Sequence, residues 1–278
     1  MIPPVANRFV AGEELDEALD HVADVNDRDV GGILNLLGEH YHERAPADED
    51  ADAYLRLIDG IAERSLEASV SVKPSQIGID LPTNAFAENL EQIVTHAKSH
   101  DVFVWVDMED HTTTDTTLDA VCNQAQRYPH GVGLAIQANL KRTREDLERL
   151  AEVPAGVRLV KGAYDEPESV AYQEKAVVDE MYEEYLEFLF REFDQGVAVG
   201  SHDPAMLSHA KSLHDTYGTP FEIQMLMGVR EDAQYDLAEE YDVYQYAPYG
   251  PKWLQYFYRR IRERKKNALF ALRAVLGI

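Results

Sequence analysis

Eight short runs of apolar and β-branched residues recur along this chain, separated by longer acidic segments with helical periodicity, and this alternation limits the fold more than any other feature. The runs cover residues 32–39, 68–75, 102–109, 131–138, 156–164, 196–203, 220–228 and 241–250. Near-continuous apolar strands that alternate with helices are typical of a parallel sheet covered on both faces. Eight regularly spaced strands in about 250 residues favour a closed (β/α)8 barrel over an open doubly wound sheet.

The segments between the runs predict amphipathic helices, most clearly over residues 51–66, 89–96 and 169–193. No linker rich in proline, glycine or serine interrupts the 278 residues, so we expect one domain over residues 1–278, with a helical lead-in over residues 1–30. Neither G-x-G-x-x-G nor G-x-x-x-x-G-K-[ST] occurs, which removes the two common nucleotide-binding loops.

The composition argues against nucleic acid as a partner and indicates a compartment. Acidic residues number 51 against 26 Lys plus Arg, a formal net charge of −25, whereas nucleic-acid binding needs a basic face. Such an excess is typical of a heavily solvated, halophilic-type surface, which repels itself at low salt. Cys122 is the only cysteine, and no signal-type or membrane-spanning apolar stretch is present, so we expect a soluble protein in the cytoplasm.

Polar residues lie at or near the ends of the apolar runs. They are Glu39, Lys73, Asp107, Gln137, Lys161, His202, Gln224 and Tyr246. Each alone could have a structural or solvated role. Because the carboxyl ends of barrel strands form the rim that carries active sites, the whole set predicts an active site there.

Two positions favour an anionic ligand. Arg158 and Lys161 place two positive charges on one run, and Gly162 and Ala163 follow, where small side chains allow a ligand close to the backbone. An ion pair with a neighbouring carboxylate is the alternative, and a lyase or aldolase that uses Lys161 as a Schiff-base nucleophile is another.

The final predicted helix gives the clearest indication of a ligand-binding site. Tyr256, Arg259, Arg260 and Glu263 are spaced three and four apart and therefore share one helix face. Adjacent arginines form a fork of donors suited to a carboxylate. The seven positive residues between Arg259 and Arg273 could instead complement the helix dipole or touch acidic lipid.

The histidines show no metal-binding spacing such as H-E-x-x-H, so no metal site is expected. Four of them lie in or beside helical patterns, where solvated roles are expected: His96, His100, His209 and His214. No G-x-S-x-G elbow supports a serine hydrolase.

Several motifs together resemble the proline dehydrogenase family. They are RLVKGAY, EIQMLMG and VYQYAPYGPKWLQYFYRRIRE, together with LNLLGE, SVKPSQIG, VDMED, GLAIQA and GSHDP, all in that family's order. The length is similar to that of the monofunctional form, without a fused aldehyde dehydrogenase domain. The resemblance implies a distorted (β/α)8 barrel that binds FAD non-covalently, oxidises L-proline to 1-pyrroline-5-carboxylate and passes electrons to a quinone.

The resemblance also implies roles for residues on the substrate side. Arg259 and Arg260 would bind the proline carboxylate, assisted by Lys73. The other members of the implied catalytic and substrate-binding set are Asp107, in a supporting polar network, and Leu226, Tyr246 and Tyr256, around the substrate ring.

On the cofactor side, the resemblance implies Arg158 near the reactive part of the flavin. Gln137, Lys161 and Gln224 would lie along the cofactor, with backbone contacts from Gly162 and Ala163. The remaining members are Lys175 at the pyrophosphate, Ser201 and His202 toward the adenosine end, and Glu263 at the FAD edge beside the arginine pair. Asn139 departs from the family pattern, which often has tyrosine there, but it lies past the strand end.

Two alternatives to a proline dehydrogenase stay open on the sequence. One is the Schiff-base lyase or aldolase barrel using Lys161, and the other is a non-catalytic barrel that binds an amino acid. The oligomeric state and peripheral contact of the basic C-terminal stretch with the inner face of the cell membrane are also open.

Overall fold

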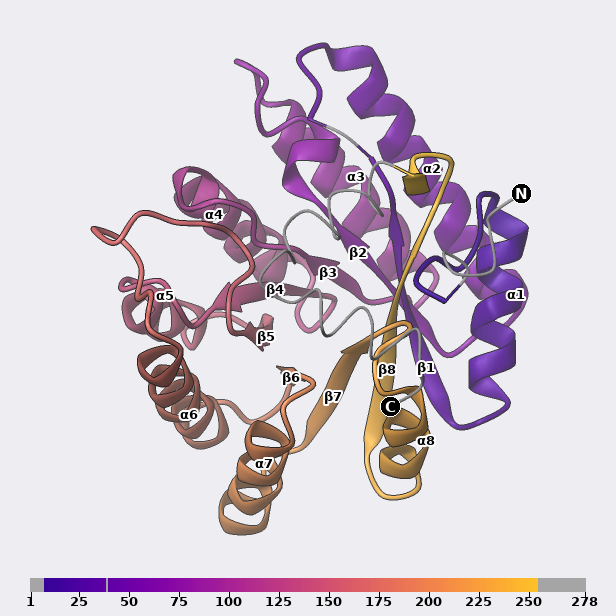
Figure 1. Ribbon diagram of the computed structural model, residues 1–278. Helices are drawn as coiled ribbons and strands as arrows, with labels where there is room; N and C mark the ends of the chain where they lie inside the picture. The colour runs from indigo at the N-terminus through magenta and orange to yellow at the C-terminus, as the bar shows by residue number, and fades with distance from the viewer. Residues whose placement is uncertain (1–7, 39, 255–278) are drawn as a thin grey trace.

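Eight parallel strands form a closed barrel in the computed structural model, which describes residues 8–38 and 40–254 (Figure 1). The strands are β1 (Val30–Leu36), β2 (Ala68–Val72), β3 (Val104–Val106), β4 (Val132–Gln137), β5 (Gly156–Val160), β6 (Val197–Gly200), β7 (Phe221–Leu226) and β8 (Asp242–Tyr249). Each pairs with the next along the chain, and β8 pairs with β1. The (β/α)8 fold predicted from the alternating pattern is confirmed.

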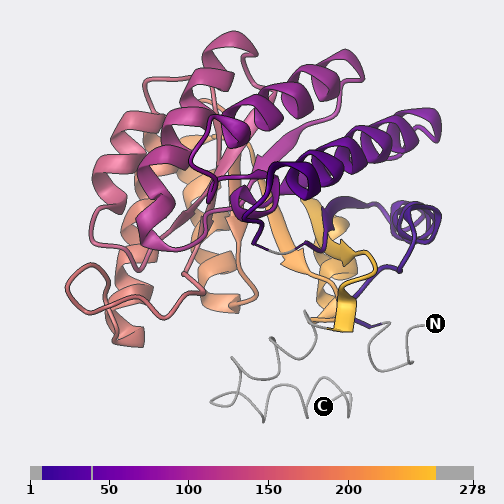
Figure 2. The same ribbon diagram turned by 90° about the horizontal axis from the view of Figure 1, so that it is seen from above.

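Helices surround the barrel on its outside (Figures 1 and 2). The α-helices are α1 (Leu15–Asn26), α2 (Arg44–Glu63), α3 (Ala85–Ser99), α4 (Thr114–Arg127), α5 (Thr143–Leu150), α6 (Lys175–Glu192), α7 (Pro204–Tyr217) and α8 (Glu231–Ala238). Two short 3-10 helices, η1 (Pro74–Ile77) and η2 (His111–Thr113), follow β2 and β3. Helix α1 lies inside the predicted lead-in, and none of these helices has both the length and the apolar character of a membrane span.

The strands end earlier than the apolar runs predict. The run over residues 68–75 stops pairing at Val72, because Pro74 has no backbone N–H and begins η1. The run over residues 156–164 stops at Val160, and Gly162 then turns the chain with a φ of 111°. After β2, burial continues past the last paired residue, since Pro74 and Ser75 are buried, whereas residues 162–164 after β5 are exposed.

The helix boundaries also differ from those predicted. Helix α2 begins at Arg44 instead of residue 51, and α3 extends beyond the predicted 89–96 at both ends. The predicted helix over 169–193 begins only at Lys175, because Ala171 pairs with Leu140 in an isolated antiparallel bridge. That tertiary contact overrides local helical propensity.

Side chains of the strands pack on both sides of the barrel wall, against the helices outside and against one another inside. Outward-facing strand residues join the main core under the helices, while Ile33, Trp105 and Ala198 form a separate cluster with Tyr244 and Tyr246 inside the barrel. The longest ladder is the seam between β1 and β8, where residues 30–36 pair in order with residues 243–249. A Cβ on Gly31 would lie 2.4 Å from the Tyr244 ring, so glycine is required where this ring crosses the seam.

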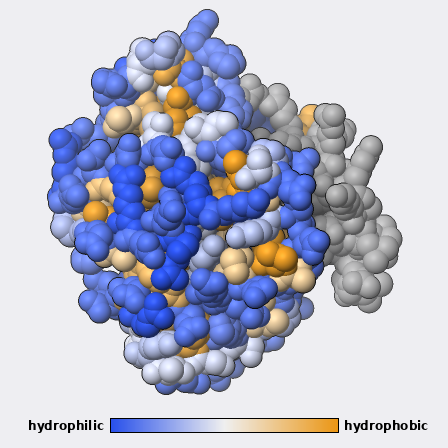
Figure 3. All heavy atoms as spheres, turned by 90° about the vertical axis from the view of Figure 1, so that its left-hand side faces the viewer, coloured by the Kyte–Doolittle hydropathy of each residue, from blue (hydrophilic) through white to orange (hydrophobic). Residues whose placement is uncertain are grey.

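The outer surface is largely polar. Figure 3 shows the face over α4, α5 and α6, where hydrophilic residues dominate and apolar ones are scattered. Its charged pairs include Asp119 with Arg149 and Glu148 with Arg144, all on exposed helix faces. A halophilic-type surface remains an expectation from the charge balance.

Candidate active site

The carboxyl ends of four strands bring together four of the residues that the sequence singled out. Lys73 and Asp107 directly follow β2 and β3, while Arg158 and Tyr246 lie within β5 and β8. Because side chains alternate along a strand, each of these residues points to the inside of the barrel near its upper end. The structure therefore joins predicted residues from four separate runs in one network.

The carboxylate of Asp107 is the centre of this network. Its Oδ1 accepts hydrogen bonds from the Ser71 hydroxyl at 2.8 Å and from the Arg158 guanidinium. Its Oδ2 accepts from the Tyr246 hydroxyl at 2.8 Å and from the Lys73 ammonium. Each carboxylate oxygen thus has two donors, and these donors come from three other strands or strand ends.

The charges in this network are mostly removed from water. The side chains of Arg158, Asp107 and Lys73 are 5%, 12% and 22% exposed, which orders them from the barrel interior toward the rim. Burial alone would raise the pKa of Asp107, but Lys73 and Arg158 outweigh it and hold that pKa well below its usual range. Asp107 is therefore an ionised anchor for two cations and a weak base.

Arg158 is fixed from several sides. Its guanidinium donates to the side-chain oxygen of Gln224 at 3.0 Å and to the Ser71 hydroxyl at 3.1 Å. The guanidinium carbon lies 5.1 Å from the centroid of the Trp105 ring and 5.6 Å from that of Tyr246, within the range of cation–π attraction. A side chain held in this way presents its charge in one orientation.

Glu222 extends the network toward the lower end of the barrel. The amide nitrogen of Gln224 donates to Glu222, which leaves the amide oxygen of Gln224 to accept from Arg158. Burial raises the pKa of Glu222 to about 7, although the hydrogen bond from Gln224 and the charge of Arg158 oppose this. The nearby carboxylates of Asp242 and Glu67 raise it further.

Lys161 lies in a second, separate group of charges. Its ammonium donates to Asp203 at 2.8 Å and to Asp179 of α6, and Lys175 at the start of α6 donates to the same Asp179. Burial lowers the pKa of Lys161, but the two carboxylates outweigh it and leave the pKa raised. A Schiff-base nucleophile needs a neutral amine, so this environment disfavours the lyase or aldolase alternative.

The loops beside β4 and β5 position the smaller predicted residues. Gln137 donates to the backbone oxygen of Glu109 at 2.8 Å, and its side-chain oxygen lies 3.4 Å from the amide nitrogen of Ala163. Asn139, the departure from the family pattern, packs against Gly162, where a Cβ would lie 2.1 Å from its side-chain oxygen. The amide of Ala163 is therefore held near the rim by both strands.

The ends of β6 and β7 position three further predicted residues. Ser201 is buried, and its hydroxyl accepts from the amide of Asp203 at 3.1 Å. The amide of Leu226, the last residue of β7, donates to Nε2 of His202 at 3.2 Å. These contacts fix the loop after β6 against the end of β7.

Five predicted residues lie outside the residues that the structure describes. They are Glu39, Tyr256, Arg259, Arg260 and Glu263. The predicted arginine fork therefore stays a prediction from the sequence.

Sequence reasoning missed four residues that the structure connects to the site. Ser71 and Glu222 each lie two positions before a residue that was chosen, on the same side of the same strand, so the strand period could have identified them. Asp179 lies four residues after Lys175 on one helix face, which is also a readable spacing. No local pattern distinguishes Asp203.

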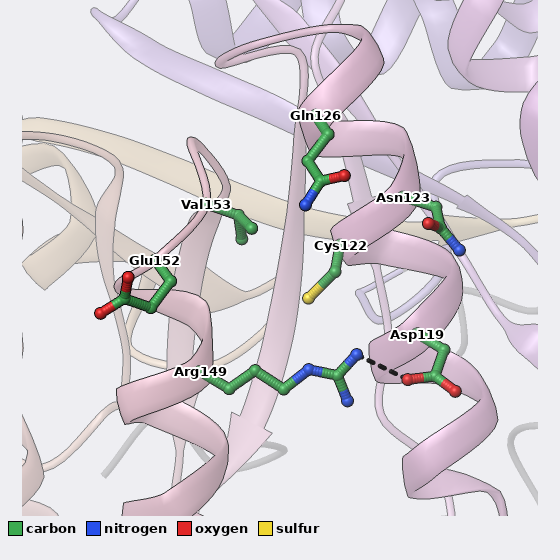
Figure 4. A pocket seen from close by; sticks show the side chains of 7 residues that line it. All are labelled: Asp119, Cys122, Asn123, Gln126, Arg149, Glu152 and Val153. Atoms are coloured by element: carbon green, nitrogen blue, oxygen red, sulfur yellow. Dashed lines mark hydrogen bonds and ion pairs between the residues drawn. The ribbon is translucent and has the colours of Figure 1, made fainter.

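A groove of about 440 Å³ lies between α4 and α5 on the outside of the barrel (Figure 4). It is lined by Asp119, Cys122, Asn123, Gln126, Arg149, Glu152 and Val153. The ion pair between Asp119 and Arg149 crosses it, and none of its lining residues belongs to the network around Asp107. We therefore place the candidate active site at the rim.

Comparisons with known proteins identify the family of the chain. A family model described as "Proline dehydrogenase" matches residues 18–273. The chain is 34% identical over 275 residues to proline dehydrogenase 1 of Bacillus subtilis strain 168, covering 98% of this chain and 90% of that protein. It is 36% identical over 282 residues to a proline dehydrogenase of Deinococcus radiodurans, with the same coverage.

Solved structures show a similar fold. Proline utilization A of Bdellovibrio bacteriovorus, inactivated by N-propargylglycine, superposes with a TM-score of 0.85 at 24% identity. The match covers 95% of this chain but only 33% of that one. A second structure of proline utilization A, with proline bound in remote sites, gives a TM-score of 0.80 at 23% identity.

Replacing Asp107 with asparagine should destabilise the fold strongly. Asparagine keeps the shape but leaves Lys73 and Arg158 without their counter-charge, and breaking such a buried pair costs about 3–5 kcal/mol. The matched control is Asp119→Asn, whose 62% exposed carboxylate pairs with Arg149 and should contribute less than about 1 kcal/mol. Urea unfolding at neutral pH measures both. Similar losses in the two variants would contradict a central role for Asp107.

Glu222 should make stability depend on pH. With a folded pKa of about 7 against an ordinary 4.5, the folded state keeps its proton where the unfolded state loses it. This contribution is fully present below pH 4.5 and is lost as pH rises toward 7, by up to roughly 3 kcal/mol. Glu222→Gln cannot ionise, so its stability relative to the parent should increase between pH 5 and pH 8. Unfolding free energies at both pH values test this, and an unchanged difference would refute it.

Proposed function

The chain belongs to the proline dehydrogenase family, and we propose that it oxidises L-proline to 1-pyrroline-5-carboxylate with FAD as the hydride acceptor and a quinone as the final electron acceptor. The observation that carries the proposal is the cluster of Lys73, Arg158 and Asp107 at the rim. Two cations share one carboxylate there, so these three groups together carry one positive charge, which the buried carboxylate of Glu109 near Lys73 partly offsets, in a chain whose formal net charge is −25. A substrate carboxylate fits that excess.

Lys73 is the described residue best placed to bind the proline carboxylate. It is the most exposed of the three charged groups, and only one of its donors is committed to Asp107. Burial would lower the pKa of Lys73, but the charge of Asp107 raises it, so the ammonium stays protonated. We assign the rest of the carboxylate site to Arg259 and Arg260, which can bind a carboxylate bidentately.

Tyr246 and Leu226 would contact the substrate ring. The hydroxyl of Tyr246 donates to Asp107, its partly buried ring would pack against the substrate ring, and Leu226 is paired with it across β7 and β8. Tyr256 would complete this apolar side. Such contacts hold the carbon next to the proline nitrogen in one position, and orientation of this kind supplies much of an enzyme's rate gain.

The described residues of the rim fit the requirements of a flavin dinucleotide. Lys161 and Lys175 meet at the start of the 18-residue helix α6, and a helix N-terminus with nearby cations suits a pyrophosphate. The amide of Ala163 and the side chains of Gln137 and Arg158 supply further donors toward the barrel centre. When bound, FAD would accept a hydride from the substrate.

The remaining cofactor contacts follow the family resemblance. We assign Gln224 and Gly162 to the same part of the cofactor as Gln137. Ser201 and His202 would lie toward the adenosine end, and Glu263 at the edge beside the arginine pair. A fixed cation such as Arg158 would favour negative charge on the reduced flavin.

The proton of the substrate amine is assigned to water. Asp107 cannot take it efficiently, because Lys73 and Arg158 hold its pKa well below the usual range against the effect of burial. Proline with a neutral amine would then be the reactive form, so activity should rise toward alkaline pH. A cytoplasmic location and peripheral membrane contact through residues 259–273 also remain predictions.

Anaerobic reduction by proline tests the proposed function directly. Protein reconstituted with FAD should be yellow, and its visible flavin absorption should bleach on addition of L-proline, because the substrate donates a hydride. D-proline serves as the control, since its carboxylate would not reach the same donors. A protein that takes up no FAD, or holds FAD that proline leaves oxidised, would overturn the proposal and favour the non-catalytic barrel.

The arginine fork has its own test. Arg259→Met and Arg260→Met keep much of the side-chain stem but remove charge-assisted bonds worth on the order of 2–4 kcal/mol, so kcat/KM for proline should fall roughly 30- to 1,000-fold. Flavin content should be retained. Arg149→Met is the matched control, because Arg149 pairs with Asp119 on the outer face. If both fork variants keep normal kinetics, the carboxylate is bound elsewhere.

A further inference from the structure

Two helices outside the barrel bring together three side chains with metal-binding chemistry. Asp59 lies near the end of α2, His96 lies in the last turn of α3, and His100 directly follows α3. The two helices pack side by side (Figure 1). Because helices in a (β/α)8 barrel run antiparallel to the strands, these helix ends lie opposite the rim that carries the candidate active site.

The three side chains converge on one point. Oδ1 of Asp59 lies 2.7 Å from Nε2 of His96 and 3.5 Å from Nε2 of His100. All three ligand atoms lie within 4.8 Å of one another, and the two imidazole centroids are 4.5 Å apart. Around an ion at about 2.0–2.2 Å in tetrahedral geometry, ligand atoms lie roughly 3.3–3.6 Å apart, so binding requires the 2.7 Å contact to open and the wider separations to close by small movements of these partly buried side chains.

The hydrogen bonds of His100 determine which of its nitrogens is available. Its Nδ1 lies 3.0 Å from the backbone oxygen of His96, and a carbonyl oxygen can only accept. The hydroxyl of Ser99 donates to the same oxygen at 2.7 Å, so its own oxygen is left to accept from Nδ1 of His100 at 3.0 Å. Nδ1 therefore carries a hydrogen, and Nε2, which faces Asp59, is the ring nitrogen available to a metal ion.

The two histidines contact the carboxylate of Asp59 unequally. A hydrogen on Nε2 of His96 can satisfy the 2.7 Å contact, whereas the 3.5 Å between Nε2 of His100 and Oδ1 of Asp59 is long for a hydrogen bond. Among the described residues, no lysine or arginine forms an ion pair with Asp59. The negative ends of the α2 and α3 dipoles and the net charge of −25 add to the attraction for a cation.

We propose that Asp59, His96 and His100 bind a divalent transition-metal ion that joins the end of α2 to the end of α3. Two imidazoles and one carboxylate are a ligand set for zinc and for the neighbouring divalent ions that imidazole prefers. The side chains are 45%, 29% and 31% exposed, which leaves an entry path and open positions for water. The backbone oxygen of His96 fixes the ring of His100, as the outer partners of metal ligands commonly do.

The sequence spacing of the two histidines is not enough to find this site, because the third ligand is distant in the sequence. His96 and His100 are four residues apart, but the sequence predicts only solvated roles for them because neither a third ligand nor a known motif is adjacent. Asp59 lies 37 residues before His96 and becomes a neighbour only through the packing of α2 on α3. The location at the end opposite the rim assigns the ion a role in stability.

Zinc titration of the chelator-treated, full-length protein tests the proposal. Calorimetry at pH 7.5 should show one zinc ion bound per chain. Asp59→Asn, His96→Gln and His100→Gln should each weaken binding by more than the about 10- to 100-fold that loss of an outer partner causes. The matched control is His40→Gln, because His40 pairs with Asp80 at 2.8 Å, as His96 does with Asp59, but without a second imidazole in the pair.

Thermal unfolding gives a second, independent measurement. Zinc should raise the melting temperature of the parent and of His40→Gln by several degrees and leave that of His100→Gln unchanged, because only a folded state with the site gains from binding. Circular dichroism verifies that each variant is folded. No zinc binding at micromolar concentrations, or equal binding by the parent and all three ligand variants, would overturn the proposal.

Discussion

The carboxylate of Asp107 is the interaction on which the candidate site depends. Ser71, Lys73, Arg158 and Tyr246 reach it from β2, β5 and β8, so one side chain on β3 fixes the positions of residues from three other parts of the barrel wall. Without a counter-charge, Arg158 could not stay 95% buried inside the barrel, because an unpaired buried cation is very costly. The barrel interior is therefore organised around a charge that does not itself react.

The group around Asp107 and the chain as a whole have net charges of opposite sign. The chain is strongly acidic overall, yet Lys73, Arg158 and Asp107 together carry one positive charge. Lys161 and Lys175 lie in a second group, where Asp179 and Asp203 balance them. Hydrogen-bonded pairs buried in the wall are screened little by salt, whereas the exposed acidic surface is screened strongly. The proposed substrate carboxylate would therefore meet less repulsion at this group than elsewhere on an acidic protein.

Much of this organisation could be predicted from the sequence, and the reasons for the exceptions are physical. The eight apolar runs predicted the barrel because burial on both faces of a parallel strand leaves a local pattern. The exact strand ends could not be predicted, since Pro74 and Ser75 stay buried after pairing stops at Val72, while the run after Val160 continues into exposed residues. Lys73, Asp107 and Tyr246 were found because each lies at or near the end of a run, and Arg158 because it places a charge inside one.

Contacts between distant segments leave no comparable pattern. The pairing of Lys161 with Asp203 depends on how the loop after β6 lies, and the meeting of Asp59 with the two histidines depends on how α2 packs on α3. Glu222 was missed for a different reason. The strand period places it on the same face as Gln224, but only its bond to Gln224 shows that it orients the amide beside Arg158.

The seam between β1 and β8 has a consequence for how the protein is made. Residues 30–36 pair with residues 243–249, so the longest ladder of the barrel joins segments that leave the ribosome more than 200 residues apart. At about 5–20 residues per second, β1 waits some tens of seconds for this partner. During synthesis its free edge is open to pairing with other chains, a hazard that edge strands carry until they are covered. Completion of β8 is therefore the event that ends the period of greatest risk of aggregation.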